Sequence, residues 1–144
     1  MIHEQIVTYE VAKLAKDKGF NVATDRYYHI YDDVKEAQNS LEMTGAGCAD
    51  FYNSLNQCRC AAPTQSLLQR WLREEKGVVV EVIAQPTCST SKKNCYWWSI
   101  KQNSDGFCYQ YEECSYLLYS DEGYFDTYEL ALEDALKYAL KKLV

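Results

Sequence analysis

Apolar residues recur at helical spacing in three stretches of the chain, beginning with "VTYEVAKLAKDKGF" near the start. Val11, Leu14 and Ala15 fall on one face of this stretch, as in an amphipathic helix. Thr8 is placed to cap the N-terminus of that helix, and Gly19 is placed to end it in the left-handed conformation. The pattern therefore predicts a first helix between these two residues.

The second helical stretch is "APTQSLLQRWLREEKG", and a strand-like run begins directly after it. Pro63 suits the first turn of a helix, and Gly77 suits its end. One face of the predicted helix is apolar and carries Leu67, Leu68, Trp71 and Leu72.

The third helical stretch, "DTYELALEDALKYALKKLV", has the longest apolar stripe. Asp126 and Glu129 resemble a capping box at its start, and lysines at its end suit the helix dipole. The stripe consists of Tyr128, Leu132, Ala135, Leu136, Ala139, Leu140 and Leu143.

Strand-like runs lie between these helices. The run 78–84 is apolar on both faces apart from Glu81, which predicts an inner strand. Asp105-Gly106 predicts a hairpin turn between two aromatic strands. The predicted strands are 26–31, 78–84, 95–101 and 107–119, and the segment 32–61 is expected to hold a short helix in "DDVKEAQNSLEM", a loop in "TGAGCAD" and a brief strand in "NQCRCAA".

This order of elements predicts an α+β fold. We expect a mainly antiparallel sheet of about four or five strands, with three helices packed mostly on one face. The length of 144 residues predicts a single domain spanning 1–144.

Charge is distributed unevenly along the chain, whose net charge is −6. Residues 1–104 are balanced, whereas the segment 105–134 contains acidic residues and no basic one. Such a segment repels nucleic-acid phosphate and attracts a basic partner. Most of these acids are expected to form solvated faces; the alternatives are a surface for a basic partner, including one that imitates nucleic-acid phosphate, and a metal site.

The chain has seven cysteines and two histidines, and no Cys-x-x-Cys motif. Cys58 and Cys60 form the only close pair, so the spacing typical of a zinc site is missing. We expect free thiols, no metal and no cofactor; whether Cys58 and Cys60 bind a metal or form a disulfide stays open. His29, among tyrosines, is expected to have a structural role. We identify no catalytic set and expect no enzymatic activity.

The helix predicted for 63–76 has one alternative interpretation, as a nucleic-acid-reading helix that uses Arg70 and Arg73. Such a helix needs a basic surface to hold phosphate. This stretch is close to neutral and the whole chain is acidic, so we expect a core helix, with its arginines solvated or paired with nearby acids.

Three sequence blocks resemble a family of small proteins of gut Bacteroides, its prophages and crAss-like phages, a family without an assigned activity. The blocks are "VTYEVAKLAKDKGF", "APTQSLLQRWLRE" and "TYELALEDALKYALKKL", and they keep the order of that family. The middle block, which opens with the signature Pro63-Thr64-Gln65-Ser66, is the most specific of the three. The resemblance implies a phage or mobile-element origin and no particular chemistry. Neither it nor the helical pattern explains the glutamines Gln65 and Gln69 of the middle block.

Aromatic residues in the predicted hairpin supply the candidate binding surface. One of Trp97 and Trp98 has to point away from the helices, because neighbouring strand residues face opposite sides of a sheet. Aromatic cross-strand pairing explains such residues, and an exposed protein-binding patch is the functional alternative. The predicted protein-binding residues are Trp97, Tyr109, Tyr111, Glu112 and Glu113.

The resemblance implies a small phage-type accessory protein, and the acidic segment and aromatic strands predict that it binds another protein or assembles with itself. No segment has the length of apolar sequence that a membrane span needs, and no secretory signal is recognised, so we expect a location in the cytoplasm of a bacterial host. A nucleic-acid-binding regulator and an acidic nucleic-acid mimic that acts on a host protein are the alternatives.

Overall fold

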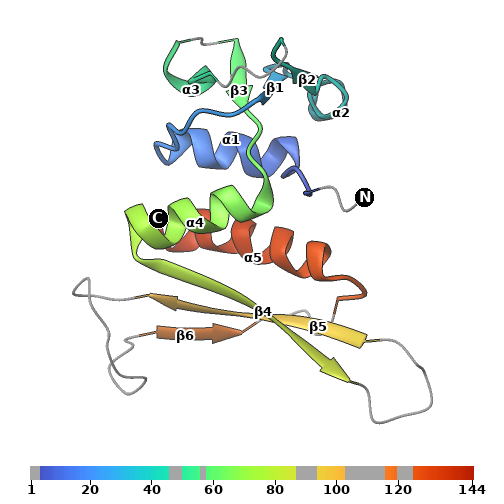
Figure 1. Cartoon of the computed structure of the whole chain (residues 1–144), viewed down its shortest axis with the longest axis vertical. Coiled ribbons are helices and arrows are strands. Elements are labelled where there is room, and N and C mark those ends of the chain that lie inside the picture. The colour runs from blue at the N-terminus through green and yellow to red at the C-terminus, as the bar shows by residue number, and fades with distance from the viewer. Residues whose placement is uncertain (1–3, 46–49, 56–57, 87–93, 103–115, 120–124) are drawn as a thin grey trace. The chain divides into compact units, whose positions relative to one another are not determined.

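The computed structural model describes residues 4–45, 50–55, 58–86, 94–102, 116–119 and 125–144 (Figure 1). The chain divides into two compact units, Met1–Leu68 and Gln69–Val144. The boundary falls inside helix α4 (Gln65–Lys76). Each unit is described by itself.

In its described residues, the first unit has three short strands and three helices that precede α4. The central strand β1 pairs antiparallel with β2 on one side and with β3 on the other. The elements are α1 (Tyr9–Asp17), β1 (Arg26–His29), α2 (Val34–Gln38), β2 (Glu42–Met43), α3 (Tyr52–Leu55) and β3 (Arg59–Ala61).

Helix α1 begins and ends where the sequence predicts. The Thr8 side chain accepts a hydrogen bond from the main-chain N–H of Val11, which satisfies one free donor of the first turn. Gly19 has a φ of 87°, a conformation that glycine adopts without steric cost. The helix lies along one face of the sheet (Figure 1).

Strand β1 alternates between the two faces of this sheet. Tyr28 points to the face covered by α1, where its hydroxyl donates to the main-chain oxygen of Val7 at 2.7 Å and its ring meets Tyr9 edge-on. Tyr27 and His29 therefore point to the opposite face, because successive strand residues alternate.

The described residues of the second unit form the C-terminal part of α4, a three-stranded antiparallel sheet in the order β4-β5-β6, and helix α5. Its elements are β4 (Val78–Pro86), β5 (Asn94–Gln102), β6 (Tyr116–Tyr119) and α5 (Tyr128–Lys142). Among the described strands β4 is an edge strand, so the prediction of an inner strand for 78–84 is wrong. Ile83, near the far end of β4, is exposed, so this part of the strand is not covered by a second neighbouring strand.

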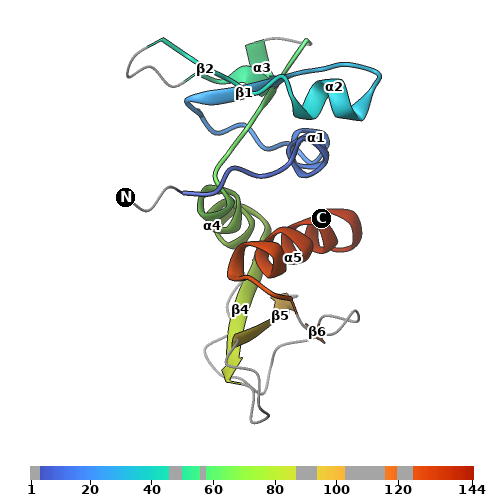
Figure 2. The ribbon, with the colours of Figure 1, turned by 90° about the vertical axis from the view of Figure 1, so that its right-hand side faces the viewer.

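Helix α5 covers one face of β4 and β5 (Figure 2). Trp98 points to this face, where its indole Nε1 donates to Asp134 Oδ2 at 2.8 Å and its ring packs on Tyr138. The helix is capped by Thr127, which accepts from the N–H of Leu130, rather than by the predicted Asp126 capping box. Its buried side chains are Ala131, Leu132, Ala135, Leu136, Ala139 and Leu140.

The predicted α+β class is confirmed. The predicted single sheet of about four or five strands and the count of three helices are wrong. The described residues form five helices and two antiparallel sheets, each of three strands. Strand β1 lies in the predicted strand 26–31, whereas the short strands β2 and β3 lie in 32–61, where hydrophobic periodicity is weakest. The prediction of a single domain stays a prediction.

Candidate interaction surface

The face of the first sheet opposite α1 collects polar and aromatic side chains from all three strands. Tyr27 and His29 come from β1. The register places Glu42 of β2 opposite Tyr27, and Arg59 of β3 opposite His29. Directly opposed residues share a face of the sheet, so these four side chains lie together.

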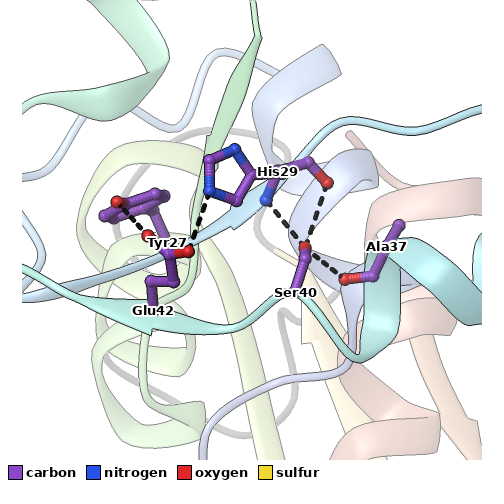
Figure 3. A network of polar contacts seen from close by, with 5 residues as sticks. All are labelled: Tyr27, His29, Ala37, Ser40 and Glu42. Atoms are coloured by element: carbon purple, nitrogen blue, oxygen red, sulfur yellow. Dashed lines mark hydrogen bonds and ion pairs between the residues drawn. The ribbon is translucent and has the colours of Figure 1, made fainter.

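A polar network joins β1 to β2 on this face (Figure 3). The hydroxyl of Tyr27 donates to Glu42 Oε2 at 2.5 Å, and His29 Nε2 lies 3.3 Å from Glu42 Oε1. The Ser40 hydroxyl accepts from the main-chain N–H of His29 at 2.9 Å and donates to the oxygen of Ala37 at 2.6 Å. These side-chain bonds add to the main-chain pairing of β1 with β2.

The network fixes the charge of its carboxylate. The hydrogen bond from Tyr27 lowers the pKa of Glu42, and the same bond raises the pKa of the Tyr27 hydroxyl. Glu42 is thus a carboxylate at neutral pH. Its side chain is 56% exposed, so the carboxylate remains accessible to a further donor.

Aromatic packing fixes the position of Tyr27 within the network. Its ring lies 4.6 Å from the ring of Tyr52, and the guanidinium of Arg59 lies 4.5 Å from its centroid. Tyr27 is only 7% exposed, whereas Tyr31, beyond the strand, is exposed. Tyr27, at the centre of the network, is therefore buried, whereas Glu42 and the nearby Tyr31 are accessible to a partner.

Exposed large apolar side chains concentrate in the segment 31–51 of the first unit. Surface patches of such side chains mark interaction sites when they are contiguous. The exposed large apolar residues of this segment are Tyr31, Val34, Leu41, Met43 and Phe51, whereas the described part of the second unit contributes Ile83, Tyr128 and Leu130.

The two edges of the first sheet differ in how they are covered. On β3, Asn53 Oδ1 accepts from the N–H of Ala61 at 2.9 Å, and Lys16 Nζ donates to the oxygen of Arg59 at 2.7 Å. Side chains thus occupy main-chain groups that point away from β1. On β2, both Glu42 and Met43 are exposed.

A pocket of about 410 Å³ lies between α1 and α2. Its polar side chains serve the helices: Thr8 caps α1, and Gln38 Oε1 accepts from the N–H of Tyr9 at 2.8 Å. The lining residues are Thr8, Glu10, Val34, Lys35, Gln38 and Asn39.

Trp97 lies on the face of the second sheet opposite α5, since Trp98 faces the helix. On the Trp97 face Lys101 Nζ donates to Glu81 Oε2 at 2.6 Å. The expectation that one of the two tryptophans points away from the helix is confirmed. The other predicted protein-binding residues, Tyr109, Tyr111, Glu112 and Glu113, lie outside the described residues.

The arginines of α4 are paired within their own helix. Arg70 Nε lies 2.9 Å from Glu74 Oε1, and Arg73 Nη2 lies 3.8 Å from the same oxygen. The helix buries Leu68, Trp71 and Leu72, as a core helix does. The expectation that these arginines pair with a nearby acid is confirmed.

The cysteines near His29 are ill suited to nucleophilic catalysis. Cys60 is fully buried, and burial raises the pKa of its thiol to about 12. Among the described residues, Cys58, Cys60 and Cys95 are not joined in disulfides. In the part of the chain that the structure describes, no group of three or more His, Cys, Asp or Glu side chains is arranged to hold a metal ion.

Sequence reasoning missed the network and the role of Gln69. The Nε2 of Gln69 donates to the main-chain oxygen of Val80 at 2.7 Å, which ties α4 to β4. Gln65 is buried at the start of the same helix. The spacing of Tyr27, His29 and Tyr31 was the one signal for the network, because a period of two puts them on one face of a strand.

None of the helices in the described ranges is long and apolar enough to cross a membrane. Comparison with protein-family models, with curated proteins and with solved structures finds no match to this chain.

Proposed function

We propose that the chain is a protein-interaction module of the kind that phages and prophages encode as accessory proteins, and that the β1–β2 side of its first unit contacts the partner. The observation that carries this proposal is the concentration of exposed large apolar side chains in 31–51, the segment that also contains Glu42 of the Tyr27–Glu42–His29 network. Protein interfaces combine such apolar and aromatic residues with a polar rim.

Two features of the network support binding rather than catalysis. Tyr27 is covered by Tyr52 and by Arg59, so the network holds a fixed shape with an accessible margin. The buried thiol of Cys60 faces the other side of the sheet, because it lies opposite Tyr28 in the register.

The nucleic-acid alternative is weaker. Arg70 and Arg73 already share the carboxylate of Glu74. A phosphate would have to compete with this pairing, on a chain that carries a net charge of −6.

Affinity capture from host lysate, with and without phage infection, tests the proposal. The tagged chain is compared with a double variant, Tyr31→Ser with Phe51→Ser, and captured proteins are identified by mass spectrometry. We expect one dominant partner that the double variant loses. The matched control is Ile83→Ser with Leu130→Ser, which alters two exposed apolar residues of the second unit and should retain the partner.

Light scattering on the purified chain measures its mass in solution and so tests whether it assembles with itself. A complex that contains only copies of this chain would show that the module binds itself. Capture that depends on Ile83 and Leu130 rather than on Tyr31 and Phe51 would contradict the placement of the surface. A monomer that captures no partner under either condition would contradict the function.

A further inference from the structure

We propose that strand β2 binds an extended segment of the partner by strand addition, and that this segment carries a basic residue opposite Glu42. This inference rests on the proposed function and specifies its contact. The added segment would become a fourth strand of the first sheet, next to β2.

The register shows which main-chain groups of β2 are accessible to a partner. The N–H of Thr44 donates to the oxygen of Asp25, which makes these two residues a hydrogen-bonded pair. The next pair along the ladder is Met43 with Arg26, followed by Glu42 with Tyr27. In an antiparallel ladder, hydrogen-bonded pairs alternate with pairs whose main-chain groups point away. The N–H and C=O of Met43 therefore point away from β1, toward the position of an added strand.

Exposure supports the same assignment. Met43 is 63% exposed, and the burial pattern of β2 is exposed throughout. Natural sheets protect edge strands with charges, prolines or covering side chains, and the opposite edge of this sheet obeys that rule at Ala61 and Arg59. Strand β2 is exposed and carries Met43 on one face and the carboxylate of Glu42 on the other. Strand-addition sites take affinity from main-chain hydrogen bonds at such an edge and specificity from the alternating side chains.

The acidic charge of the segment around β2 favours a basic partner. The segment 24–61 contains six acidic residues and three basic ones, so it attracts a basic chain. Arg59 does not reverse this locally, since its guanidinium is held over the ring of Tyr27, one strand farther from the added chain than Glu42. A second copy of this chain would bring the same acidic surplus to the contact, and is disfavoured for that reason.

The geometry defines the pattern that the added strand must carry. Its residue opposite Glu42 belongs to a non-hydrogen-bonded pair, in which side chains approach closely. A lysine or arginine there meets the accessible carboxylate. The residue opposite Met43 faces the other side and is apolar, so the predicted recognition element alternates basic and apolar residues.

Fluorescence anisotropy with the full chain and labelled peptides tests this inference. The probe is a peptide of about ten residues in which lysine alternates with valine and threonine. Its control has glutamate at each lysine. We expect the lysine peptide to bind and the glutamate peptide to bind at least about tenfold more weakly, with an affinity for the lysine peptide that falls as salt rises.

Variants of the chain separate the main-chain and side-chain contributions. Met43→Pro removes the outward N–H and should weaken peptide binding about tenfold, whereas Met43→Ala retains that N–H and should bind within about threefold of the wild type. Glu42→Gln keeps an oxygen for the Tyr27 hydroxyl, removes the charge, and should cost about threefold.

A modified peptide keeps the test valid if Met43→Pro fails to fold. N-methylation of the peptide amides on alternate residues blocks strand addition in one of the two registers and leaves the protein untouched. We expect one N-methylated series to lose binding and the other to retain it. Equal binding by both series would overturn strand addition.

Three further results would overturn the inference: no binding of the lysine peptide, equal binding of the glutamate peptide, or a dimer of the chain that Met43→Pro dissociates. Lysate capture distinguishes this failure from failure of the function. If a partner is lost with Tyr31→Ser and Phe51→Ser but retained with Met43→Pro, the interaction module stands and strand addition at β2 falls.

Discussion

The two edges of the first sheet present opposite solutions to the same physical problem. Both β2 and β3 flank β1, and each has main-chain groups that point away from it. On β3 the N–H of Ala61 is bound by Asn53 and the oxygen of Arg59 is bound by Lys16. On β2 the strand is exposed, and Met43 is its most accessible residue.

The covered edge β3 contributes to the stability of the fold, whereas the exposed edge β2 is available for binding. Ala61 is buried, so its N–H needs a partner for the fold to be stable. The outward main-chain groups of β2 belong to Met43, which is 63% exposed. Main-chain groups at an exposed strand can bond to water in place of a protein partner. An edge that water satisfies can exchange that water for a partner, and this exchange is what strand addition requires.

A pair of proline substitutions should have the largest effect that separates the two edges. Ala61→Pro removes the N–H that Asn53 binds and should lower the free energy of unfolding by about 3 kcal/mol. Met43→Pro removes an outward N–H at an exposed edge and should cost within about 1 kcal/mol. Urea unfolding monitored by circular dichroism measures both. Equal losses would show that the two edges are not different in the way described.

Removing the side chain that covers β3 should have the next largest effect. Asn53 also donates to the oxygen of Phe20 at 2.7 Å, so Asn53→Ala leaves two main-chain groups without this partner. We expect a loss of about 2 kcal/mol in thermal or urea unfolding. The control Ser54→Ala changes an exposed neighbour and should stay within about 0.5 kcal/mol. A loss for Asn53→Ala no larger than this control would contradict the covering role.

The buried side of β3 also predicts a dependence on pH. Burial raises the pKa of Cys60 from 9.0 to about 12, so the folded state favours the neutral thiol. The resulting stability is complete below pH 9 and is lost as the pH rises toward 12, because the unfolded chain ionises first. The stability difference between wild type and Cys60→Ala should therefore shrink by about 1.4 kcal/mol between about pH 7 and about pH 10.

Val11→Ala is the matched control for the Cys60 measurement. Val11 is buried in the same unit and has no titratable group, so its stability difference from wild type should not change with pH. A Cys60→Ala difference that stays constant over the same pH range would contradict the assignment.

Much of the fold can be predicted from local patterns. The caps and stops at Thr8, Gly19 and Gly77 are set by side chains and glycines whose conformational preferences act locally. Helix α5 is predicted by a long amphipathic stripe. The division into two sheets could not be derived this way, because β2 and β3 are too short to show a period and owe their pairing to contacts distant in sequence.

The site was harder to predict than the fold. Strand alternation, a local rule, correctly predicts that one of Trp97 and Trp98 points away from the helix, but it does not say which one. The Tyr27–Glu42 bond joins residues that periodicity does not relate, and no local pattern defines the register of β2. The role of Gln69 could not be predicted either, because its partner is a main-chain oxygen and every residue has one.

Amide hydrogen exchange at Met43 and Ala61, monitored by two-dimensional NMR on the full chain, tests the central claim most directly. In the free protein the Met43 amide should exchange quickly, while the Ala61 amide is protected by its bond to Asn53. Addition of the lysine peptide should protect Met43 and leave Ala61 unchanged. A Met43 amide that is already protected in the free protein, or that exchanges equally fast with saturating peptide, would contradict the account of β2 as an open edge that accepts a strand.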